Sequence, residues 1–427
     1  MDPGGPAEPK SPSADPFLAL NTDTASTYGA LLRVPAFARI YTSMLLGRVS
    51  GQMVTVTLVL FVLGRYHSPQ LAGITAFLAI FPGLVVSPVA GALLDRHGRS
   101  RLVVLDYLIA TFAVALIAVL SVLHSLPPAL LLVIVGISSL TNPLSATGAR
   151  TLIPILAPKH LWERANALDS GGHVISQLVG SPLAGVLVGV AGPEKALAVS
   201  AGLFAAAALV MFRIPDPSPK TQAGNPILIE AWQGLVYVVR NATLRGLALT
   251  LGTFNLCWGV LTIAIPVLIL DRLHQGPATV GLLWGAMGAA GLASALISGR
   301  IPSQGREWHL MLGAILVSAA GFAVLPFAHS LPVVVAAVVL VGLANGPFDI
   351  GLFTLRQRRT DPAWFGRAFA VSMSLNWVGT PIGAAFAGPI IGWSLDGALW
   401  VVVAVALFAA VFPLLALPAR RKAGSTA

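Results

Sequence analysis

The sequence carries little charge. Asp, Glu, Lys and Arg make up only 10% of its 427 residues, whereas a soluble globular chain is typically about a quarter charged. Hydrophobic residues make up 56%, and the mean hydropathy is +0.84. The apolar residues fall in blocks of about 20, the length of a helix that spans a bilayer. The composition therefore excludes an ordinary soluble fold and predicts an integral membrane protein.

Cysteine is nearly absent, and so are common catalytic motifs. The single Cys257 stands in an apolar block, which excludes an intrachain disulfide and a cysteine-based metal site. No G-x-x-x-x-G-K-[ST] phosphate loop and no His-Glu-x-x-His cluster occurs, so nucleotide hydrolysis by that route and a zinc protease are excluded. We expect no cofactor, no metal site, no catalytic residue and no enzymatic activity.

The net charge of +10 does not indicate a nucleic-acid binder. The basic residues stand singly or in short clusters between apolar blocks and do not gather on one polar face. We therefore expect no nucleic-acid partner.

Apolar runs broken by charges, Pro and Gly predict an all-α integral membrane protein of twelve transmembrane helices in two pseudo-symmetric six-helix halves. The first six helices are expected near residues 37–63, 71–94, 102–122, 129–149, 166–190 and 195–212. The second six are expected near residues 246–269, 278–299, 308–327, 331–354, 366–391 and 394–417.

The segments outside these blocks complete the predicted organisation. A disordered cytoplasmic tail is expected over 1–35, an N-terminal six-helix bundle over 36–212, a cytoplasmic linker over 213–245, a C-terminal bundle over 246–418 and a second tail over 419–427. Within the linker, Ile227 to Arg240 mixes apolar and polar residues at helical spacing, which predicts a helix at the membrane surface.

Lys and Arg predict the orientation, because basic loops stay on the cytoplasmic side. If the N-terminus is cytoplasmic, all of the 26 basic residues fall in inner segments except Arg65, Lys195 and Arg272 in outer loops and Arg48 within a span. Both termini are therefore predicted to be cytoplasmic.

The two halves repeat at an offset of about 203 residues. Leu140 and Asn142 recur as Leu343 and Asn345, and Trp-Glu-Arg-Ala from residue 162 recurs as Phe-Gly-Arg-Ala from residue 365. Repeated six-helix halves are typical of secondary transporters, whose solute site lies at the interface between halves that rock against each other.

The run Gly-Ala-Leu-Leu-Asp-Arg-His-Gly-Arg, from Gly91 to Arg99, resembles the G-x-x-x-D-R-x-G-R signature of the major facilitator superfamily. The runs at 164–168, 180–185 and 345–346 are similar to the branch with enterobactin-type exporters and multidrug efflux proteins, although Ser181 replaces a glycine of the efflux motif. The resemblance implies a monomer and a conformational latch at the inner surface; the alternative is that the arginines only set topology. The implied latch residues are Gly91, Asp95, Arg96, Gly98 and Arg99.

Ionisable residues within membrane helices are costly and are site candidates by default. Asp349 breaks the internal repeat with a charge where the first half has Ala146, and it is a candidate proton-coupling residue unless it forms an ion pair with Arg48 or Arg356.

Asp169, His173 and Gln177 recur every fourth residue and so share one helix face. The Asp169 carboxylate and the His173 imidazole could interact and carry a proton. The alternative is that Asp169 lies at the inner membrane interface and His173 only satisfies a helix contact.

Further polar and aromatic residues could line a cavity for an amphipathic solute, or could serve helix packing. They are Arg48, Gln52, Gln177, Asn142, Asn255, Trp258, Asn345, Asn376 and Trp377.

Together these features predict a multi-pass secondary active transporter of the bacterial cytoplasmic membrane. Its expected partners are a small-molecule solute, protons and the lipid bilayer. The expected activity is proton-coupled efflux of drug-like or siderophore-like compounds. Uptake symport, facilitated diffusion and a non-transporting sensor or scaffold remain alternatives.

Overall fold

A computed structural model describes residues 27–34, 36–214, 227–299, 304–361 and 365–423. These ranges form helices and no β-strand, so the predicted all-α fold is confirmed for them. The first part contains α1 (Tyr28–Leu32), α2 (Phe37–Tyr66), α3 (Pro69–His97), α4 (Arg99–Val122), α5 (Pro128–Ser139), α6 (Asn142–Leu156), the short η2 (Lys159–Leu161), α7 (Trp162–Ala191) and α8 (Pro193–Met211).

The second part begins with the linker helix. It contains α9 (Ile227–Arg240), α10 (Ala242–Val267), the π-helical η3 (Leu268–Arg272), α11 (Pro277–Ser298), α12 (Glu307–Val324), the short η4 (Leu325–Phe327), α13 (Leu331–Arg359), α14 (Phe365–Trp377), α15 (Gly379–Trp393) and α16 (Leu395–Ala423).

The predicted terminal tails and linker lie partly outside the described residues, at 1–26, 215–226 and 424–427. Where they are described, both tails contain helical residues, which the predicted disorder over 1–35 did not include. Tyr28–Leu32 is helical because Thr27 caps its first turn and Leu31 is buried. At the other end, α16 continues beyond residue 418 to Ala423.

Within the described ranges, 11 segments are long and apolar enough to cross a membrane. The prediction of a single helix over 366–391 is wrong, because α14 and α15 divide this stretch at Val378. Pro381 has no N–H to donate to the carbonyl four residues earlier, which favours a break at this position. The helix predicted over 129–149 is likewise divided into α5 and α6. Pro143 lies in the first turn of α6.

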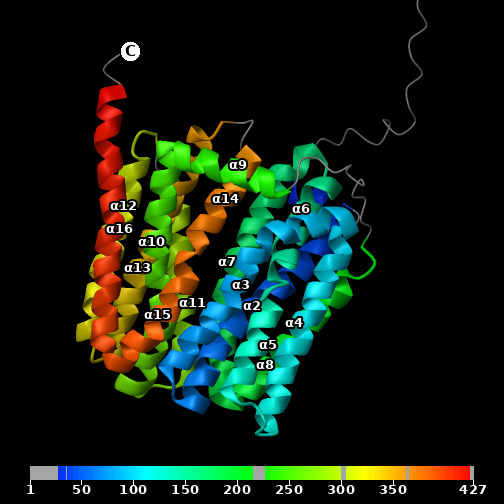
Figure 1. Cartoon of the computed structure of the whole chain (residues 1–427), viewed down its shortest axis with the longest axis vertical. Helices are drawn as coiled ribbons and strands as arrows, with labels where there is room; N and C mark the ends of the chain where they lie inside the picture. The colour runs from blue at the N-terminus through cyan, green and yellow to red at the C-terminus, as the bar shows by residue number, and fades with distance from the viewer. Residues whose placement is uncertain (1–26, 35, 215–226, 300–303, 362–364, 424–427) are drawn as a thin grey trace, which may run out of the picture.

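The helices form two groups that lie side by side (Figure 1). The N half contains α2 to α8, and the C half contains α10 to α16, while α9 crosses one end of the molecule. We call this end, which carries α9, the α3–α4 turn and the end of α13, the basic end. The opposite end, which carries Arg65, Lys195 and Arg272, is called the far end.

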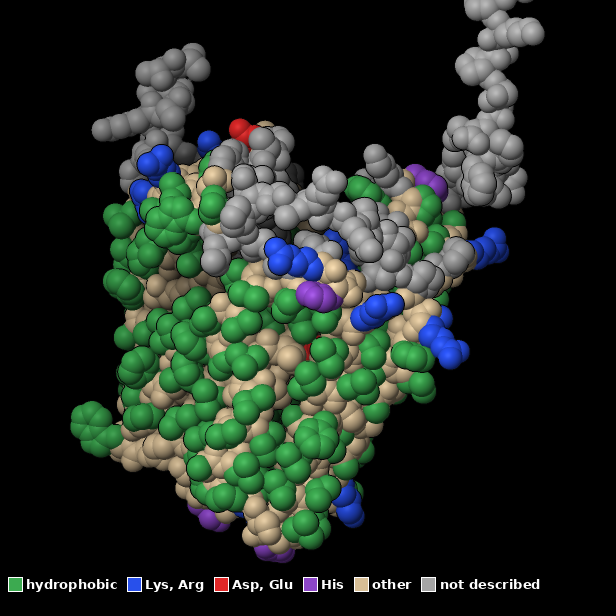
Figure 2. All heavy atoms as spheres, turned by 45° about the vertical axis from the view of Figure 1, so that its right-hand side comes forward, with side chains coloured by type: hydrophobic (Ala, Val, Ile, Leu, Met, Phe, Trp, Pro, Cys, Tyr) green, Lys and Arg blue, Asp and Glu red, His purple; other side chains and the backbone are tan. Residues whose placement is uncertain are grey.

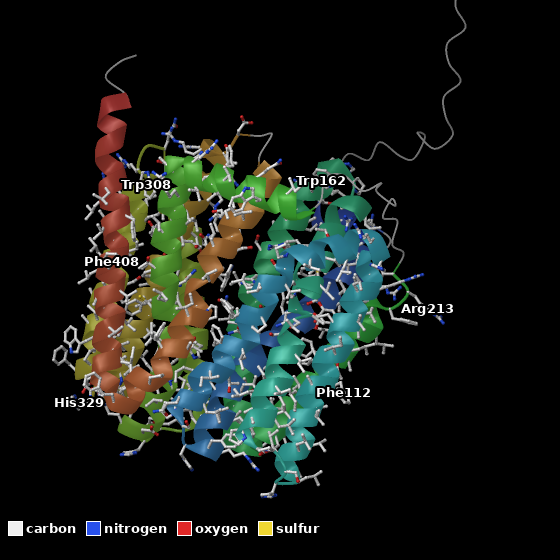
Figure 3. The ribbon with its side chains drawn as sticks, in the orientation of Figure 1. Phe112, Trp162, Arg213, Trp308, His329 and Phe408 are labelled. Carbon is white, nitrogen blue, oxygen red and sulfur yellow. The ribbon has the colours of Figure 1, made fainter. Side chains whose placement is uncertain are left out.

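Apolar side chains cover the flanks between these ends (Figure 2). Phe112 of α4 and Phe408 of α16 point away from the bundle on opposite sides (Figure 3) and are 69% and 57% exposed. Exposed apolar flanks of this size fit a lipid surface.

The hydrophobic core differs between the two ends. Toward the far end, one cluster of buried side chains joins both halves, whereas toward the basic end each half has its own separate core. The shared cluster includes Phe61, Leu197, Leu261 and Ile391, the N-half core includes Phe37, Tyr107 and Met211, and the C-half core includes Leu247, Trp308 and Leu355. The hydrophobic cores of the two halves are thus joined toward the far end and separate toward the basic end.

Glycines allow this far-end packing. α7 and α11 cross where Gly185 faces Gly281, and a Cβ added to Gly281 would lie 2.9 Å from the Gly185 Cα. Small residues let two helix backbones approach closely, as in many membrane interfaces.

Replacing Gly281 by Val should therefore push α7 and α11 apart at the far end. We expect a lower melting temperature in detergent and greater labelling of cysteines introduced near the far end. Gly276, whose Cβ position meets nothing within 4 Å, supplies the control Gly276→Val. Equal behaviour of the two variants would contradict this packing.

Candidate functional site

Three helices of the N half meet at one buried carboxylate. Asp169 lies two turns into α7, and its side chain is 6% exposed. Its Oδ1 accepts a hydrogen bond from Arg48 of α2 at 2.6 Å, and its Oδ2 accepts from Arg150 of α6 through Nε at 2.7 Å. Arg48 also donates to the backbone carbonyl of Asp169 at 2.8 Å. We call Arg48, Asp169 and Arg150 the charge triad.

The local sequence explains this meeting point. Arg48 lies in the first half of α2 counted from the basic end, and Arg150 lies two turns before the end of α6 at the same end. Because α7 starts at the basic end, its second turn reaches the same depth. A carboxylate buried at this depth needs a partner, and two guanidinium groups supply charge-assisted hydrogen bonds.

The triad changes the interpretation of His173. Both carboxylate oxygens of Asp169 accept hydrogen bonds from arginines. The His173 ring is exposed, and its Nε2 lies 3.4 Å from the side-chain nitrogen of Gln177, one turn further along α7. The side-chain hydrogen bonds of Asp169 therefore come from the two arginines and not from His173.

Two N-half candidates serve helix contacts. Gln52 donates to the Ser181 hydroxyl at 2.9 Å and so joins α2 to α7. Asn142, at the start of α6, is exposed and donates to the carbonyl of Ala79 in α3 at 3.3 Å.

Asp349 in the C half has a different environment. Its side chain is exposed and forms no hydrogen bond or ion pair within the part of the chain that the structure describes. It stands nine residues after Leu340, an exposed apolar residue, and nine residues place two side chains on opposite faces of a helix. Asp349 therefore lies on the face of α13 opposite this apolar residue, while Asn345, one turn earlier, lies beside Gly291 of α11.

The alternative ion pairs of Asp349 do not form among the described residues. Arg48 binds Asp169. Arg356 is buried within the C half, where its Nη1 lies 2.9 Å from the Met373 sulfur. In the Asn376 amide orientation that forms hydrogen bonds with both neighbours, the nitrogen donates to the Ser372 carbonyl at 2.9 Å and the oxygen accepts from Arg356.

The remaining C-half candidates divide into packed and open residues. Asn255 of α10 donates to the backbone carbonyl of Asn376 at 2.7 Å, which joins α10 to α14. Trp258 packs edge to face against Phe322 in the core. Trp377 is 47% exposed at the end of α14.

The signature segment forms a sharp turn. α3 ends at His97, α4 begins at Arg99, and Gly98 between them has a φ of +93°, a conformation that favours glycine. Arg96 is exposed and Gly91 is half-buried on α3, whereas the side chain of Asp95 lies outside the described part of the structure.

Sequence reasoning missed Arg150. The predicted helix ended at residue 149, so Arg150 was counted with the basic residues of a cytoplasmic loop. The helical spacing of Gly-Ala-Arg-Thr-Leu-Ile, which continues to Leu156, is the signal that could have extended the helix and placed an arginine within it.

Comparison with known proteins agrees with this architecture. The family model described as Major Facilitator Superfamily matches residues 40–375 and 247–427. The chain is 37% identical over 396 residues to the MFS-type transporter y4rN of Sinorhizobium fredii, covering 92% of this chain and 97% of that one.

More distant relatives carry names of efflux proteins. The multidrug efflux pump Tap of Mycolicibacterium fortuitum is 26% identical, with 84% of this chain and 89% of that one covered. Macrolide efflux protein A of Streptococcus pyogenes is 20% identical, with 81% and 87% covered.

Solved structures show the same fold. The nucleoside transporter NupG superposes with a TM-score of 0.73 at 12% identity, covering 88% of this chain and 98% of that one. A bacterial homologue of the lysosomal transporter Spinster, in an inward-facing and unoccupied conformation, superposes with a TM-score of 0.68 at 14% identity, covering 90% and 96%. Since the family model spans nearly the whole membrane part and a relative above 30% identity covers nearly all of both chains, this multi-pass membrane protein belongs to the major facilitator superfamily of transporters.

Proposed function

We propose that this chain is a twelve-helix secondary active transporter that exports small molecules from the cytoplasm in exchange for protons. The observation that carries the proposal is Asp349, an exposed carboxylate on a membrane helix with no partner among the described residues. Such a group is costly in a membrane unless it meets water, a proton or a solute.

The twelfth span of the proposal is the pair α14 and α15. Together they cover residues 365–393, which is long enough to cross a bilayer despite the break at Val378. With this span counted, an even number of crossings brings both termini to the basic end. The excess of Lys and Arg there favours a cytoplasmic location.

A reporter fused after Ala427 tests this topology. Green fluorescent protein fused there is expected to fluoresce, and alkaline phosphatase fused there is expected to be inactive, because the fusion point stays in the cytoplasm. Phosphatase activity at this point would contradict the twelve-helix arrangement.

The separate cores at the basic end support alternating access. The halves share a hydrophobic core only toward the far end, which fits a conformation in which they part toward the proposed cytoplasmic side. Rocking about the glycine crossing of α7 and α11 would expose the interface between the halves to the other side. In this scheme the turn around Gly98 acts as the latch, with Gly91, Asp95, Arg96 and Arg99 supplying its contacts.

Asp349 is the proposed proton carrier in preference to Asp169. Both side-chain oxygens of Asp169 are already bound by arginines. Asp349 has no such cation within the described part of the chain, so it can exchange a proton when the solute binds or leaves.

The proposed direction is export. Two relatives are named efflux proteins, and this supports export of drug-like or siderophore-like compounds. Uptake symport remains the alternative, because the fold itself does not set direction.

Transport into inside-out vesicles tests the proposal. When the vesicle lumen is made acidic, export should appear as accumulation of solute inside the vesicles. Release of preloaded solute under the same gradient indicates symport, and accumulation that ignores the gradient indicates facilitated diffusion. A deletion strain with unchanged solute tolerance and altered protein interactions would instead favour a sensor or scaffold.

A further inference from the structure

The charge triad is unbalanced. Arg48 and Arg150 each carry one positive charge, and Asp169 carries one negative charge, so the cluster has one excess positive charge. Within the described residues, no second carboxylate lies within ion-pair distance of either arginine. Membrane helices rarely retain an unbalanced charge without a function.

The excess charge is accessible. The Arg150 side chain is 55% exposed and that of Arg48 is 20% exposed, whereas Asp169 between them is buried at 6%. Arg150 directs its Nε and one terminal nitrogen at Asp169, which leaves donors of its planar fork free for another acceptor. The arginines are therefore fixed in place by Asp169 and still open toward a ligand.

A glycine lies against Arg48. Gly172 follows Asp169 by three residues on α7, so the two share one helix face. A Cβ at Gly172 would lie 3.4 Å from both the Arg48 Nη1 and the Tyr41 hydroxyl. The absence of a side chain at Gly172 thus leaves these two hydrogen-bond donors uncovered on this face of α7.

Further polar groups lie on the same face of α7. His173 follows Gly172 and is exposed, with Gln177 one turn beyond it. We call the site formed by Arg48, Arg150, Gly172 and His173 the basic recess.

We propose that the basic recess binds an anionic group of the transported solute, so that the substrates of this transporter are small organic anions or zwitterions. The inference rests on the proposed transport function and narrows its substrate class. The fixed guanidinium groups match the planar, two-oxygen geometry of a carboxylate, which they bind through paired hydrogen bonds. Asp169 is the positioning residue that holds both arginines at the recess.

A matched pair of dyes tests the recess directly. A xanthene dye with a free carboxylate and its methyl ester differ by one negative charge and little in shape. We expect the purified protein in detergent to bind the free acid at least about tenfold more tightly than the ester in a fluorescence-anisotropy titration, since a hydrogen bond to a charged group contributes at least this factor.

Two variants locate the binding to the recess. Arg150→Gln removes the exposed charge, and Gly172→Val places methyl groups beside the Arg48 guanidinium without changing any charge. Both are expected to lower affinity for the free acid about tenfold or more and to change affinity for the ester by less than about twofold. Arg65→Gln at the far end removes one positive charge away from the recess and should change neither affinity.

The outcomes separate this inference from the proposed function. Equal affinity for acid and ester across several such dye pairs, or no binding of any of them, overturns the recess as an anion site. A parallel loss of both affinities in Arg150→Gln overturns it as well. If the protein prefers the acid but shows no gradient-driven transport, the recess is an anion site and coupled export is refuted. If the gradient drives transport of the ester alone, coupled export holds and the recess is not an anion site.

Discussion

Replacing Asp349 by Asn is expected to abolish gradient-driven accumulation of solute in inside-out vesicles. The amide has nearly the same shape as the carboxyl group but cannot take up or release a proton. Because Asp349 is exposed and forms no hydrogen bond or ion pair among the described residues, the change should leave folding intact. Exchange of labelled for unlabelled solute across the membrane, which needs no net proton movement, should continue.

The control for this variant is Asp396→Asn. Asp396 forms an exposed ion pair with Arg272 at 2.6 Å at the far end, away from the proposed cavity. Surface pairs of this kind contribute little to stability, and we expect normal accumulation. If Asp349→Asn still accumulates solute against a gradient at wild-type protein levels, Asp349 is not the proton carrier.

Replacing Asp169 by Ala is expected to destabilise the N half strongly. The change removes the common acceptor that joins α2, α6 and α7 and leaves two guanidinium groups facing each other without an anion. Breaking a buried ion pair by removing one partner costs about 3 to 5 kcal/mol. The melting temperature of the purified protein in detergent should therefore fall well below that of the wild type.

A second substitution distinguishes charge imbalance from lost packing. In the Asp169→Ala background, Arg48→Met removes the less exposed of the two stranded cations and should recover part of the lost stability. If Asp169→Ala has the same melting temperature as the wild type, the triad does not hold the three helices together. The same conclusion follows if Arg48→Met lowers the melting temperature of Asp169→Ala further.

The membrane helices were predictable because each is a long apolar block between charged or turn-forming residues. The breaks within them were not. Pro143 and Pro381 each lie within an apolar block, and helix periodicity continues across both of them. Whether a proline bends a membrane helix or divides it depends on neighbouring helices that can satisfy the freed carbonyl.

The site was predictable in part. Polar residues at membrane depth drew attention to Arg48, Asp169 and Asp349, but their partners could not be read from spacing. Helical spacing suggested that Asp169 would meet His173 on its own helix, whereas its ion pairs come from two other helices. Arg150 was missed because a helix boundary was placed one residue before it, and boundaries are the least certain feature of a sequence pattern.

The measurement that tests proton-coupled export most directly uses liposomes that contain only the purified protein and a pH-sensitive dye in the lumen. Molecules inserted with the basic end outward are selected by blocking the others with a membrane-impermeant cysteine reagent at a cysteine placed near the far end. With an acidic lumen, adding solute outside should raise the luminal pH as solute enters, and Asp349→Asn should show no rise. Solute entry with no change of luminal pH, or with further acidification, would contradict exchange of solute for protons.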